Sequence, residues 1–486
     1  MKNIKKFTIL HSNDFHGDFF EESVDNKISG GISRLSGYVQ KVRKENENVL
    51  YTISGDMFRG SIIDSEYKGI STIEIINLIN PDAVTLGNHE IDYGIAHLLF
   101  IEKMAKFPIL NANLYIKNMS TRLFKPYKII EMGGIKILII GIITEEIVAA
   151  AKKDELIGSF INVEEAAREV ERICNNYKTI DIDFTIVLTH IGIDADIELA
   201  NLINYNCGVD LILGGHSHTF LKKPLLVNGI LIAQAGYGSD NVGRFDIDID
   251  TDRNCVDTYT WSLVPISEDS PRDLVMEETL NHYQSLIDNK YERIVAKLSE
   301  TLTHPKRNQE TTLGDFFTDI LKTSLNIDIM FVASGSIRGE SLGPVVKYLT
   351  LKEIFPYDDA IYMIHLKGYL LRKIIMHLLR EEAFTGRTEF YQISKDMQII
   401  YSRSKRELLS FKYKGLDIND EDVFTVGIQN YHFANLLEFF NLTFEEAEQI
   451  KKPRVISTSC LDIIDEYLST HDEICLNFER RIIIEE

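Results

Sequence analysis

The segment FTILHSNDFHG at residues 7–17 joins a short apolar run to a polar turn that contains Asp14 and His16. The apolar run has the length and composition of a buried strand. In α/β proteins, ligands bind just beyond the carboxyl ends of such strands. The segment therefore predicts an α/β domain whose first loop carries a carboxylate and an imidazole at a functional site.

Similar apolar runs recur through the first half of the chain, at residues 49–53, 83–86, 108–110, 135–143, 184–188, 209–213 and 230–233. Longer amphipathic stretches, such as residues 32–44 and 163–177, separate them, as in a layered α/β domain. The run ILII at residues 137–140 is apolar at every position, which indicates a strand that is buried on both faces. We therefore expect one large α/β domain, over residues 1–268, with helices that cover its sheets.

Four of these runs also end in polar turns, which read GDMFRG (55–60), GNHEID (87–92), THIG (189–192) and GGHSH (214–218). A single aspartate or histidine after a strand is usually a turn or surface residue, but ligand-type residues at five strand ends favour a metal site. Carboxylate, imidazole and amide ligands without thiolate suit Zn²⁺, Mn²⁺ or Fe²⁺. The ligands are too many for one tetrahedral ion. We expect two divalent ions, about 3.5–4 Å from each other, that share a bridging carboxylate. This arrangement favours phosphoester hydrolysis.

In this order, HSNDFHG and the four turns resemble the five blocks of the calcineurin-like metallophosphoesterases. More narrowly, the whole chain resembles the 5′-nucleotidase family. The resemblance implies a four-layer α/β/β/α sandwich, joined by a long helix to a second, smaller α/β domain. It also implies hydrolysis by in-line attack of a metal-activated hydroxide.

The resemblance further assigns roles to individual residues. It implies that one metal ion is held by Asp14, His16, Asp56 and His218, and a second by Asp56, Asn88, His190 and His216. Asp56 would bridge the two ions. His89 matches the family's catalytic histidine, and Asp92 matches the carboxylate that orients it. A positioned imidazolium can stabilise or protonate the leaving oxygen in the transition state.

A helix over residues 269–300 is predicted to connect two domains. Ser270, Pro271 and Asp273 supply an N-cap, a first-turn proline and an acidic residue three positions after the cap. Beyond this helix, the pattern predicts helices over residues 313–325 and 369–379 and strands over residues 327–332, 360–366 and 423–428. A second α/β domain over residues 301–486, concerned with substrate recognition, follows from this order.

Three short motifs in the second half resemble the C-terminal domain of the same family: SGSIR (334–338), FPY (355–357) and Asn430-Tyr431. The resemblance implies that Arg338 binds the nucleotide and that Tyr357 and Tyr431 sandwich its base. The chain also departs from the family. Ala333 replaces the usual asparagine before the SGSIR motif, and the expected Gly-Gly-Asp-Gly run after Tyr431 is replaced by Phe433-Ala434-Asn435-Leu436-Leu437.

Composition limits the partners of the protein. The 486 residues include 52 Lys and Arg against 73 Asp and Glu, a formal net charge of −21, so we expect no nucleic-acid polymer and no membrane surface as partner. A small anion is compatible with this charge where a metal ion reverses the sign inside a cleft. The five cysteines contain no CxxC pair and indicate reduced, mostly buried thiols. Together with the absence of a signal-type or membrane-spanning apolar run, they predict a cytoplasmic protein whose mature chain begins near residue 1.

We therefore expect a phosphohydrolase that acts on a small nucleotide, most simply a nucleoside 5′-monophosphate. A 2′,3′-cyclic-nucleotide phosphodiesterase and a nucleotide-sugar or dinucleotide pyrophosphatase stay open as alternatives, because the metal site does not distinguish them. A non-catalytic nucleotide sensor is a further alternative, but such a protein would be expected to lack His89, Asp92 or the bridging ligand. The physiological metal, the preferred base and the oligomeric state stay open.

Overall fold

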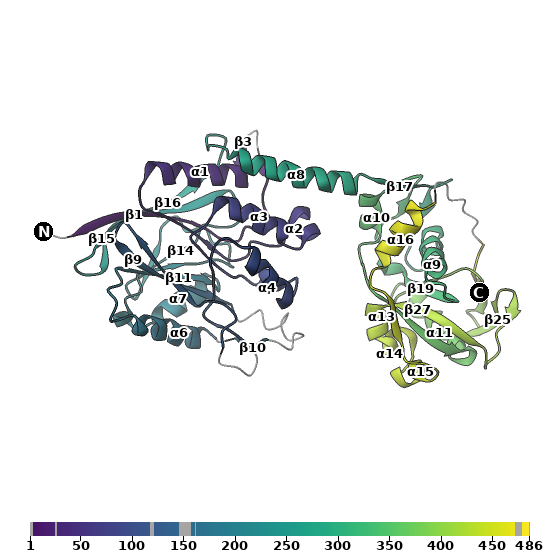
Figure 1. Ribbon diagram of the computed structural model, residues 1–486. Helices are drawn as coiled ribbons and strands as arrows, with labels where there is room; N and C mark the ends of the chain where they lie inside the picture. The colour runs from purple at the N-terminus through teal and green to yellow at the C-terminus, as the bar shows by residue number, and fades with distance from the viewer. Residues whose placement is uncertain are drawn as a thin grey trace. The chain divides into compact units, whose positions relative to one another are not determined.

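The computed structural model describes residues 3–24, 27–116, 121–144, 157–160, 162–471 and 479–485. The chain divides into two compact units, Met1–Ile287 and Asp288–Glu486 (Figure 1). The passage from one unit to the other lies within helix α8 (Leu274–Tyr291).

Two six-stranded sheets form the centre of the first unit, within the described residues. In the first sheet the strand order is β16 (Cys255–Pro265), β15 (Asn241–Asp250), β1 (Ile4–Ser12), β4 (Val49–Ser54), β5 (Ala83–Thr85) and β6 (Ile109–Leu110). In the second sheet it is β13 (Leu225–Val227), β14 (Ile230–Ala233), β12 (Leu211–Leu213), β11 (Phe184–His190), β9 (Ile135–Ile143) and β8 (Tyr127–Met132). Strands β1, β4, β5 and β6 are parallel, as are β14, β12, β11 and β9, so each sheet gathers several carboxyl ends at one edge. Two small ribbons complete the unit, β2 (Glu21–Val24) with β3 (Lys27–Gly30) and β7 (Leu114–Ile116) with β10 (Ile157–Phe160).

The two sheets pack face to face and are covered by helices on their outer sides. Ile9 and Leu50 of the first sheet share a buried apolar cluster with Ile137, Ile186 and Leu188 of the second. A second cluster lies under α6 (Val163–Asn176) and α7 (Ile193–Leu202). On the other side, α1 (Ile32–Glu45) contacts β4 and α3 (Ile70–Ile79), and α3 contacts α4 (Ile95–Met104). The predicted four-layer α/β/β/α sandwich is confirmed (Figure 1).

Helix α8 is shorter than the predicted connector over residues 269–300. Asp273, and not Ser270, caps it, because the Asp273 carboxylate accepts the backbone N–H groups of Val275 and Met276. The helix ends at Tyr291. Ile294, which continues its apolar spacing, belongs instead to β17 (Ile294–Lys297), which pairs with β21 (Val345–Lys347), and Leu298 follows that strand.

The second unit is built on a five-stranded and a four-stranded sheet within the described residues. The strand order of the larger sheet is β23 (Tyr391–Ile393), β19 (Ile329–Ala333), β27 (Val423–Gln429), β22 (Ile361–Lys367) and β28 (Arg454–Ser457). The smaller sheet has the order β26 (Leu416–Asp417), β25 (Glu407–Tyr413), β24 (Met397–Ser402) and β29 (Ile482–Glu485). A short ribbon joins β18 (Leu302–Thr303) to β20 (Ser341–Leu342). The helices are α9 (Thr312–Leu325), α10 (Tyr348–Ile354), α11 (Gly368–Leu378), α12 (Glu381–Phe384), α13 (Asn430–Ala434), α14 (Leu436–Phe440), α15 (Phe444–Glu448) and α16 (Cys460–Ser469). This unit is the predicted second α/β domain.

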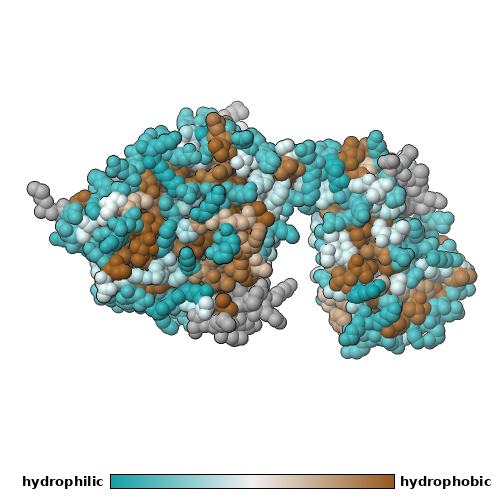
Figure 2. All heavy atoms as spheres, in the orientation of Figure 1, coloured by the Kyte–Doolittle hydropathy of each residue, from teal (hydrophilic) through white to brown (hydrophobic). Residues whose placement is uncertain are grey.

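Hydrophilic residues cover most of the visible face of the molecule, with apolar side chains between them in smaller groups (Figure 2). In the described ranges, no helix is both long and apolar enough to cross a bilayer. Cys174 and Cys460 are free and buried, whereas Cys207 is half-buried and Cys255 is exposed, so burial was predicted correctly for only part of the cysteines. Cys475 lies outside the described residues.

Candidate functional site

The predicted ligands lie at the carboxyl ends of five strands: His190 is the last residue of β11, and the others lie in the loops that follow β1, β4, β5 and β12. These strands belong to both sheets of the first unit, and side chains of Ser54 and His190 join the sheets at this edge. Ser54 at the end of β4 donates its hydroxyl to the carbonyl of Leu213 in β12, with an oxygen–oxygen distance of 2.7 Å. The Nδ1 atom of His190 lies 2.9 Å from the carbonyl oxygen of Ser54. Loops that are far apart in the sequence therefore meet at one place.

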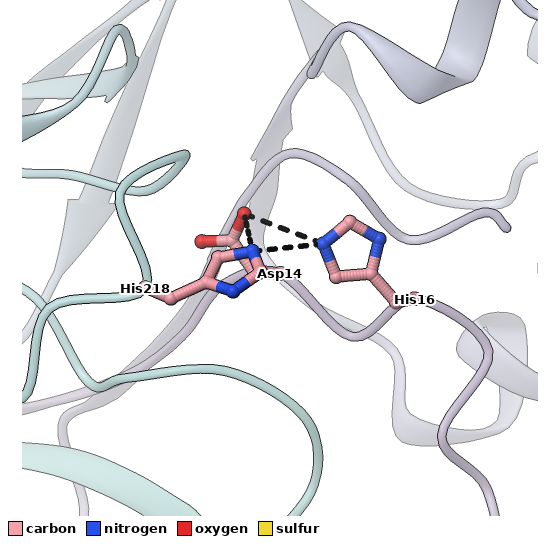
Figure 3. Close-up of side chains that lie close together, drawn as sticks. All are labelled: Asp14, His16 and His218. Atoms are coloured by element: carbon pink, nitrogen blue, oxygen red, sulfur yellow. Dashed lines mark hydrogen bonds and ion pairs between the residues drawn. The ribbon is translucent and has the colours of Figure 1, made fainter. Parts of the chain in front are cut away.

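Asp14, His16 and His218 form the first group of converging donors (Figure 3). The Nε2 atoms of the two histidines are 3.0 Å apart. Asp14 Oδ1 lies 3.5 Å from Nε2 of His218 and 3.8 Å from Nε2 of His16. Asp14 is fully buried, and its other oxygen accepts a hydrogen bond of 2.6 Å from the Asn13 amide.

Asp56, His190 and His216 form the second group. Asp56 Oδ2 lies 3.1 Å from Nε2 of His190. The amide oxygen of Asn88 lies 3.2 Å from Nε2 of His190 and 3.0 Å from Nδ1 of His216. An amide oxygen, a carboxylate and two imidazoles therefore converge, as the resemblance implied.

Asp56 lies between the two groups. The oxygen that faces His190 is also 3.8 Å from Nε2 of His16 in the first group. Burial alone would raise the pKa of Asp56, but the charge and hydrogen bond of His190 outweigh it and lower this pKa to about 2. Burial alone would lower the pKa of His190, but Asp56 and Asp14 raise it to about 9. The site thus holds a buried anionic carboxylate that attracts positive charge from both sides.

The backbone at the ligand positions is unusual. Asp14, His16, Asp56, His216 and His218 all have φ between 49° and 79°, in the left-handed region that non-glycine residues rarely adopt. Backbone hydrogen bonds hold this conformation, from the N–H of Asp14 to the carbonyl of Gly55 and from the N–H of His16 to the carbonyl of Asp56. Strained backbone of this kind persists where many surrounding contacts hold it in place, and it occurs often at functional sites.

The donor set fits a pair of divalent cations. Oxygen and imidazole ligands without thiolate converge in two groups, and Asp56 is within reach of both. The close approach of two imidazole nitrogens, from His16 and His218, is favourable when a cation accepts a lone pair from each. The structure therefore brings the seven predicted metal-binding residues together, in two groups that could each hold an ion.

His89 and Asp92 lie beside this centre, at the two ends of the short 3₁₀ helix η1 (His89–Ile91). The Nδ1 atom of His89 is 2.8 Å from Oδ2 of Asp92, and the backbone N–H of His89 donates to Oδ1 of Asp56 at 2.9 Å. A ring nitrogen of His89 also comes within 4.8 Å of donor atoms of His16 and Asp56. The geometry is compatible with the predicted catalytic pair and also with a role of His89 as a ligand.

Glu90 has a structural role that sequence reasoning missed. Its side chain is buried, and its carboxylate accepts the backbone N–H groups of Gly87, Asp56, Met57 and Phe58 at 2.5–3.2 Å. The carboxylate therefore joins the loop after β5 to the loop after β4 and fixes the position of the shared ligand. The one sequence feature that pointed to a role for Glu90 is its place inside the GNHEID turn.

The second unit brings together the segments that carry the predicted substrate residues. The guanidinium of Arg338 donates to the hydroxyl of Tyr357 and lies over its ring, 5.1 Å from the ring centroid. The N–H of Asn430, next to Tyr431 at the start of α13, donates to the carbonyl of Ala360 at 2.8 Å, so this helix start and the loop that carries Tyr357 are neighbours. Tyr357 and Tyr431 are 44% and 59% exposed, which leaves their rings accessible to a ligand.

The segment that departs from the family forms two short helices, α13 and α14. Phe433 of α13 stacks on Tyr362 of β22, with ring centroids 4.0 Å apart and an interplanar angle of 7°. His432 is buried and its Nδ1 atom lies 2.7 Å from the hydroxyl of Tyr391. Aromatic packing therefore takes the place of the glycine-rich run.

Two family models match the chain. Residues 7–220 match the calcineurin-like phosphoesterase family, and residues 294–441 match the 5′-nucleotidase C-terminal domain. The 5′-nucleotidase of Mus musculus is 26% identical over 449 residues, which cover 82% of this chain and 76% of that protein. A 5′-nucleotidase-related protein of Glossina morsitans morsitans is 28% identical over 446 residues, with 82% and 79% covered.

Solved structures share the fold over nearly the whole chain. The 5′-nucleotidase precursor of Thermus thermophilus has a TM-score of 0.56 and 22% identity, with 99% of both chains covered. The NAD nucleotidase of Haemophilus influenzae has a TM-score of 0.55 and 18% identity, again with 99% of both covered. Motifs, metal-ligand geometry and both family models agree, and the chain therefore belongs to the 5′-nucleotidase family, with a calcineurin-like phosphoesterase domain followed by a 5′-nucleotidase C-terminal domain.

Proposed function

We propose that this chain is a metal-dependent phosphohydrolase that releases phosphate from nucleoside 5′-monophosphates. The observation that carries the proposal is the convergence of two donor groups on Asp56, next to the His89–Asp92 pair. Asp14, His16, Asp56 and His218 would hold one ion, and Asp56, Asn88, His190 and His216 the other. We propose Zn²⁺, Mn²⁺ or Fe²⁺ because the ligands are oxygen and imidazole. When bound, such a pair activates water and neutralises charge on the phosphoryl oxygens.

His89 would act on the leaving group. A carboxylate only accepts hydrogen bonds, so Nδ1 of His89 must carry a proton where it meets Asp92. Asp92 thus occupies Nδ1 and leaves Nε2 for the substrate, where the doubly protonated ring would carry its second proton. As water oxygen bonds to phosphorus and the phosphorus–ester oxygen bond breaks, Nε2 of the imidazolium would give its proton to the leaving oxygen.

The second unit would recognise the nucleotide. Arg338 offers a planar donor for phosphate or carboxylate oxygens, and the exposed rings of Tyr357 and Tyr431 offer faces on which a base can stack. The name of the Mus musculus relative, 5′-nucleotidase, supports a nucleoside monophosphate as substrate.

One observation favours a second candidate, hydrolysis of a nucleotide diester or pyrophosphate. By the resemblance, Ala333 and the segment from Phe433 to Leu437 differ from the family's substrate domain, and Phe433 stacks on Tyr362. A changed pocket would suit a different nucleotide ester, such as a 2′,3′-cyclic nucleotide or a nucleotide sugar, at the same metal centre.

A phosphate-release screen tests both candidates. Chelator-treated protein would be supplied with Zn²⁺, Mn²⁺ or Fe²⁺ in turn and offered nucleoside 5′-monophosphates, cyclic nucleotides and nucleotide sugars. Metal-dependent release from monophosphates supports the first candidate, and preference for the other esters supports the second. Hydrolysis that survives chelation, or a purified protein that binds no divalent ion, would refute both. The predicted cytoplasmic location stays a prediction, which cell fractionation would test.

A further inference from the structure

Arg59 occupies a strained position in the loop between β4 and α2 (Ile62–Tyr67). Its φ of 68° lies in the left-handed region, as do those of the nearby ligands His16 and Asp56. Glycine is the usual residue there, because a side chain makes this conformation unfavourable. An arginine in this conformation therefore requires contacts that offset the cost of the strained backbone.

A buried carboxylate holds Arg59 in this conformation. Oδ2 of Asp64 accepts the backbone N–H of Arg59 at 2.8 Å and the hydroxyl of Tyr93 at 2.9 Å. Asp64 is fully buried, and Oδ1 accepts the hydroxyl of Thr72 at 2.5 Å. The loop after β4 and the loop after β5 are thus anchored on one group.

The Arg59 side chain reaches the catalytic pair of the proposed function. Its Nε atom donates to Oδ2 of Asp92 at 2.8 Å, and the same oxygen faces Nδ1 of His89 at 2.8 Å. The guanidinium lies over the ring of Tyr93, 5.4 Å from its centroid. Two donors therefore fix one carboxylate oxygen, and the arginine itself is held by an aromatic ring.

Stability alone does not account for this arrangement. The Arg59 side chain is 50% exposed, and ion pairs at that exposure stabilise proteins little. A free carboxylate rotates easily about its last bond, because that torsion is broad. We propose that Arg59 is a positioning residue that fixes Asp92, so that His89 presents Nε2 to the leaving oxygen. This inference rests on the proposed function and adds a third member to the His89–Asp92 pair.

The inference predicts a dependence on the leaving group. When the phosphorus–ester oxygen bond breaks, a nucleoside alkoxide must receive a proton from His89, whereas p-nitrophenolate leaves readily without one. Arg59→Gln should therefore lower kcat for a nucleoside 5′-monophosphate by about ten-fold, which is less than the full effect of losing a general acid. It should lower kcat for p-nitrophenyl phosphate by less than about three-fold. KM should change little for either substrate.

Three further measurements separate positioning from general damage. In the Asp92→Asn background, Arg59→Gln should cost almost nothing more, because the two residues act as one unit. Metal content and the thermal midpoint should stay at wild-type values. Arg244→Gln is the matched control, since Arg244 makes the same kind of Nε contact, 2.9 Å from Asp246, with a carboxylate outside the His89–Asp92 pair. Should Arg59→Gln not fold, Arg59→Gly removes the side chain and relieves the left-handed strain.

Equal losses for both substrates, losses that add to those of Asp92→Asn, or loss of metal would overturn the inference. Wild-type activity in the variant would overturn it as well, while leaving the proposed function intact. A wild-type protein that hydrolyses neither substrate would instead refute the proposed function, and this inference with it.

Discussion

At the scale of single residues, Asp56 is the side chain on which both donor groups depend. Its Oδ2 atom lies 3.1 Å from His190 in one group and 3.8 Å from His16 in the other. Asp56→Asn should therefore lower metal content at both positions and abolish turnover, because a neutral amide bridges two cations poorly. His218→Ala should lower metal content at one position. Elemental analysis beside activity measures both effects, and full metal content in Asp56→Asn would contradict the bridging role.

The position of His89 is compatible with two roles, as a general acid beside Asp92 and as a metal ligand. If it acts on the leaving group, His89→Asn should lower kcat by about 10²–10⁴ and leave metal content nearly unchanged. Asp92→Asn should have a smaller effect, since Asp92 acts through His89 at 2.8 Å. Loss of metal from His89→Asn would identify His89 as a ligand, consistent with its closeness to His16 and Asp56.

Residues of the site differ in how far the sequence could predict them. The convergence of the proposed metal ligands could be predicted, because each belongs to a short block at the end of a recognisable apolar strand. The roles of Glu90 and Arg59 were not predicted, although both lie inside those blocks. Their roles come from hydrogen bonds between different loops, which no local pattern of residue types records.

At the scale of elements, one buried arginine joins the C-terminal strand to α9. Arg481 lies just before β29, which pairs with β24. Its guanidinium donates to Asp319 at 2.7 Å and to the carbonyl of Ile393 at 2.6 Å, and it lies 3.4 Å from Asp315. Glu310 accepts the backbone N–H groups of Arg481 and Ile482. One arginine therefore faces three acidic side chains.

This imbalance makes the stability of the second unit depend on pH. Burial raises the pKa of Asp315 to about 8, although Arg481 opposes the shift. The carboxyl group of Asp315 therefore binds its proton more tightly in the folded than in the unfolded state. The free energy of unfolding that this proton contributes is fully present below pH ~4 and is lost as pH rises toward 8. Asp315→Asn removes a charge that is costly to bury, so its thermal midpoint should exceed that of the wild type by a margin that grows from pH 5 to pH 9.

The matched control for this prediction is Asp319→Asn. Asp319 hydrogen-bonds Arg481 directly, so its replacement weakens a contact of a buried cation and should destabilise the unit at every pH. Hydrogen exchange at the amides of β29 gives a local readout beside the thermal midpoint. A constant difference between Asp315→Asn and wild type across this range would show that Asp315 does not titrate in the folded protein.

Strands were predicted more reliably than the end of the long helix. The apolar runs at residues 49–53 and 135–143 became β4 and β9 with bounds that agree within one residue, because parallel strands covered on both faces need continuous apolar sequence. The connector helix was predicted to run on to residue 300, but it ends at Tyr291. Apolar spacing continues through Ile294, and β17 forms there because β21 offers a backbone partner that only the tertiary structure supplies.

At the scale of the whole molecule, the fold alone does not define the substrate. The solved structures that share this fold include a 5′-nucleotidase precursor and an NAD nucleotidase. Related architectures thus carry different activities, and specificity depends on individual side chains. The departures that the resemblance indicates, at Ala333 and around Phe433, lie in the second unit. The test of nucleotide recognition therefore belongs to residues of that unit.

Tyr357→Ala and Tyr431→Ala each remove one proposed stacking face. A base–aromatic stack is worth about 1–3 kcal/mol in single-stranded nucleic-acid complexes, so kcat/KM for a nucleoside monophosphate should fall by roughly five- to 150-fold in each variant. p-Nitrophenyl phosphate lacks a nucleobase, so its kcat/KM should change much less while the metal centre is intact.

Tyr369→Ala is a suitable control, because Tyr369 is also exposed, at 38%, and its hydroxyl contacts Gln449 in the same unit. Equal losses for both substrates would indicate structural damage. No loss for either would place the base elsewhere and would mean that the stacked Phe433 and Tyr362 mark a differently built pocket.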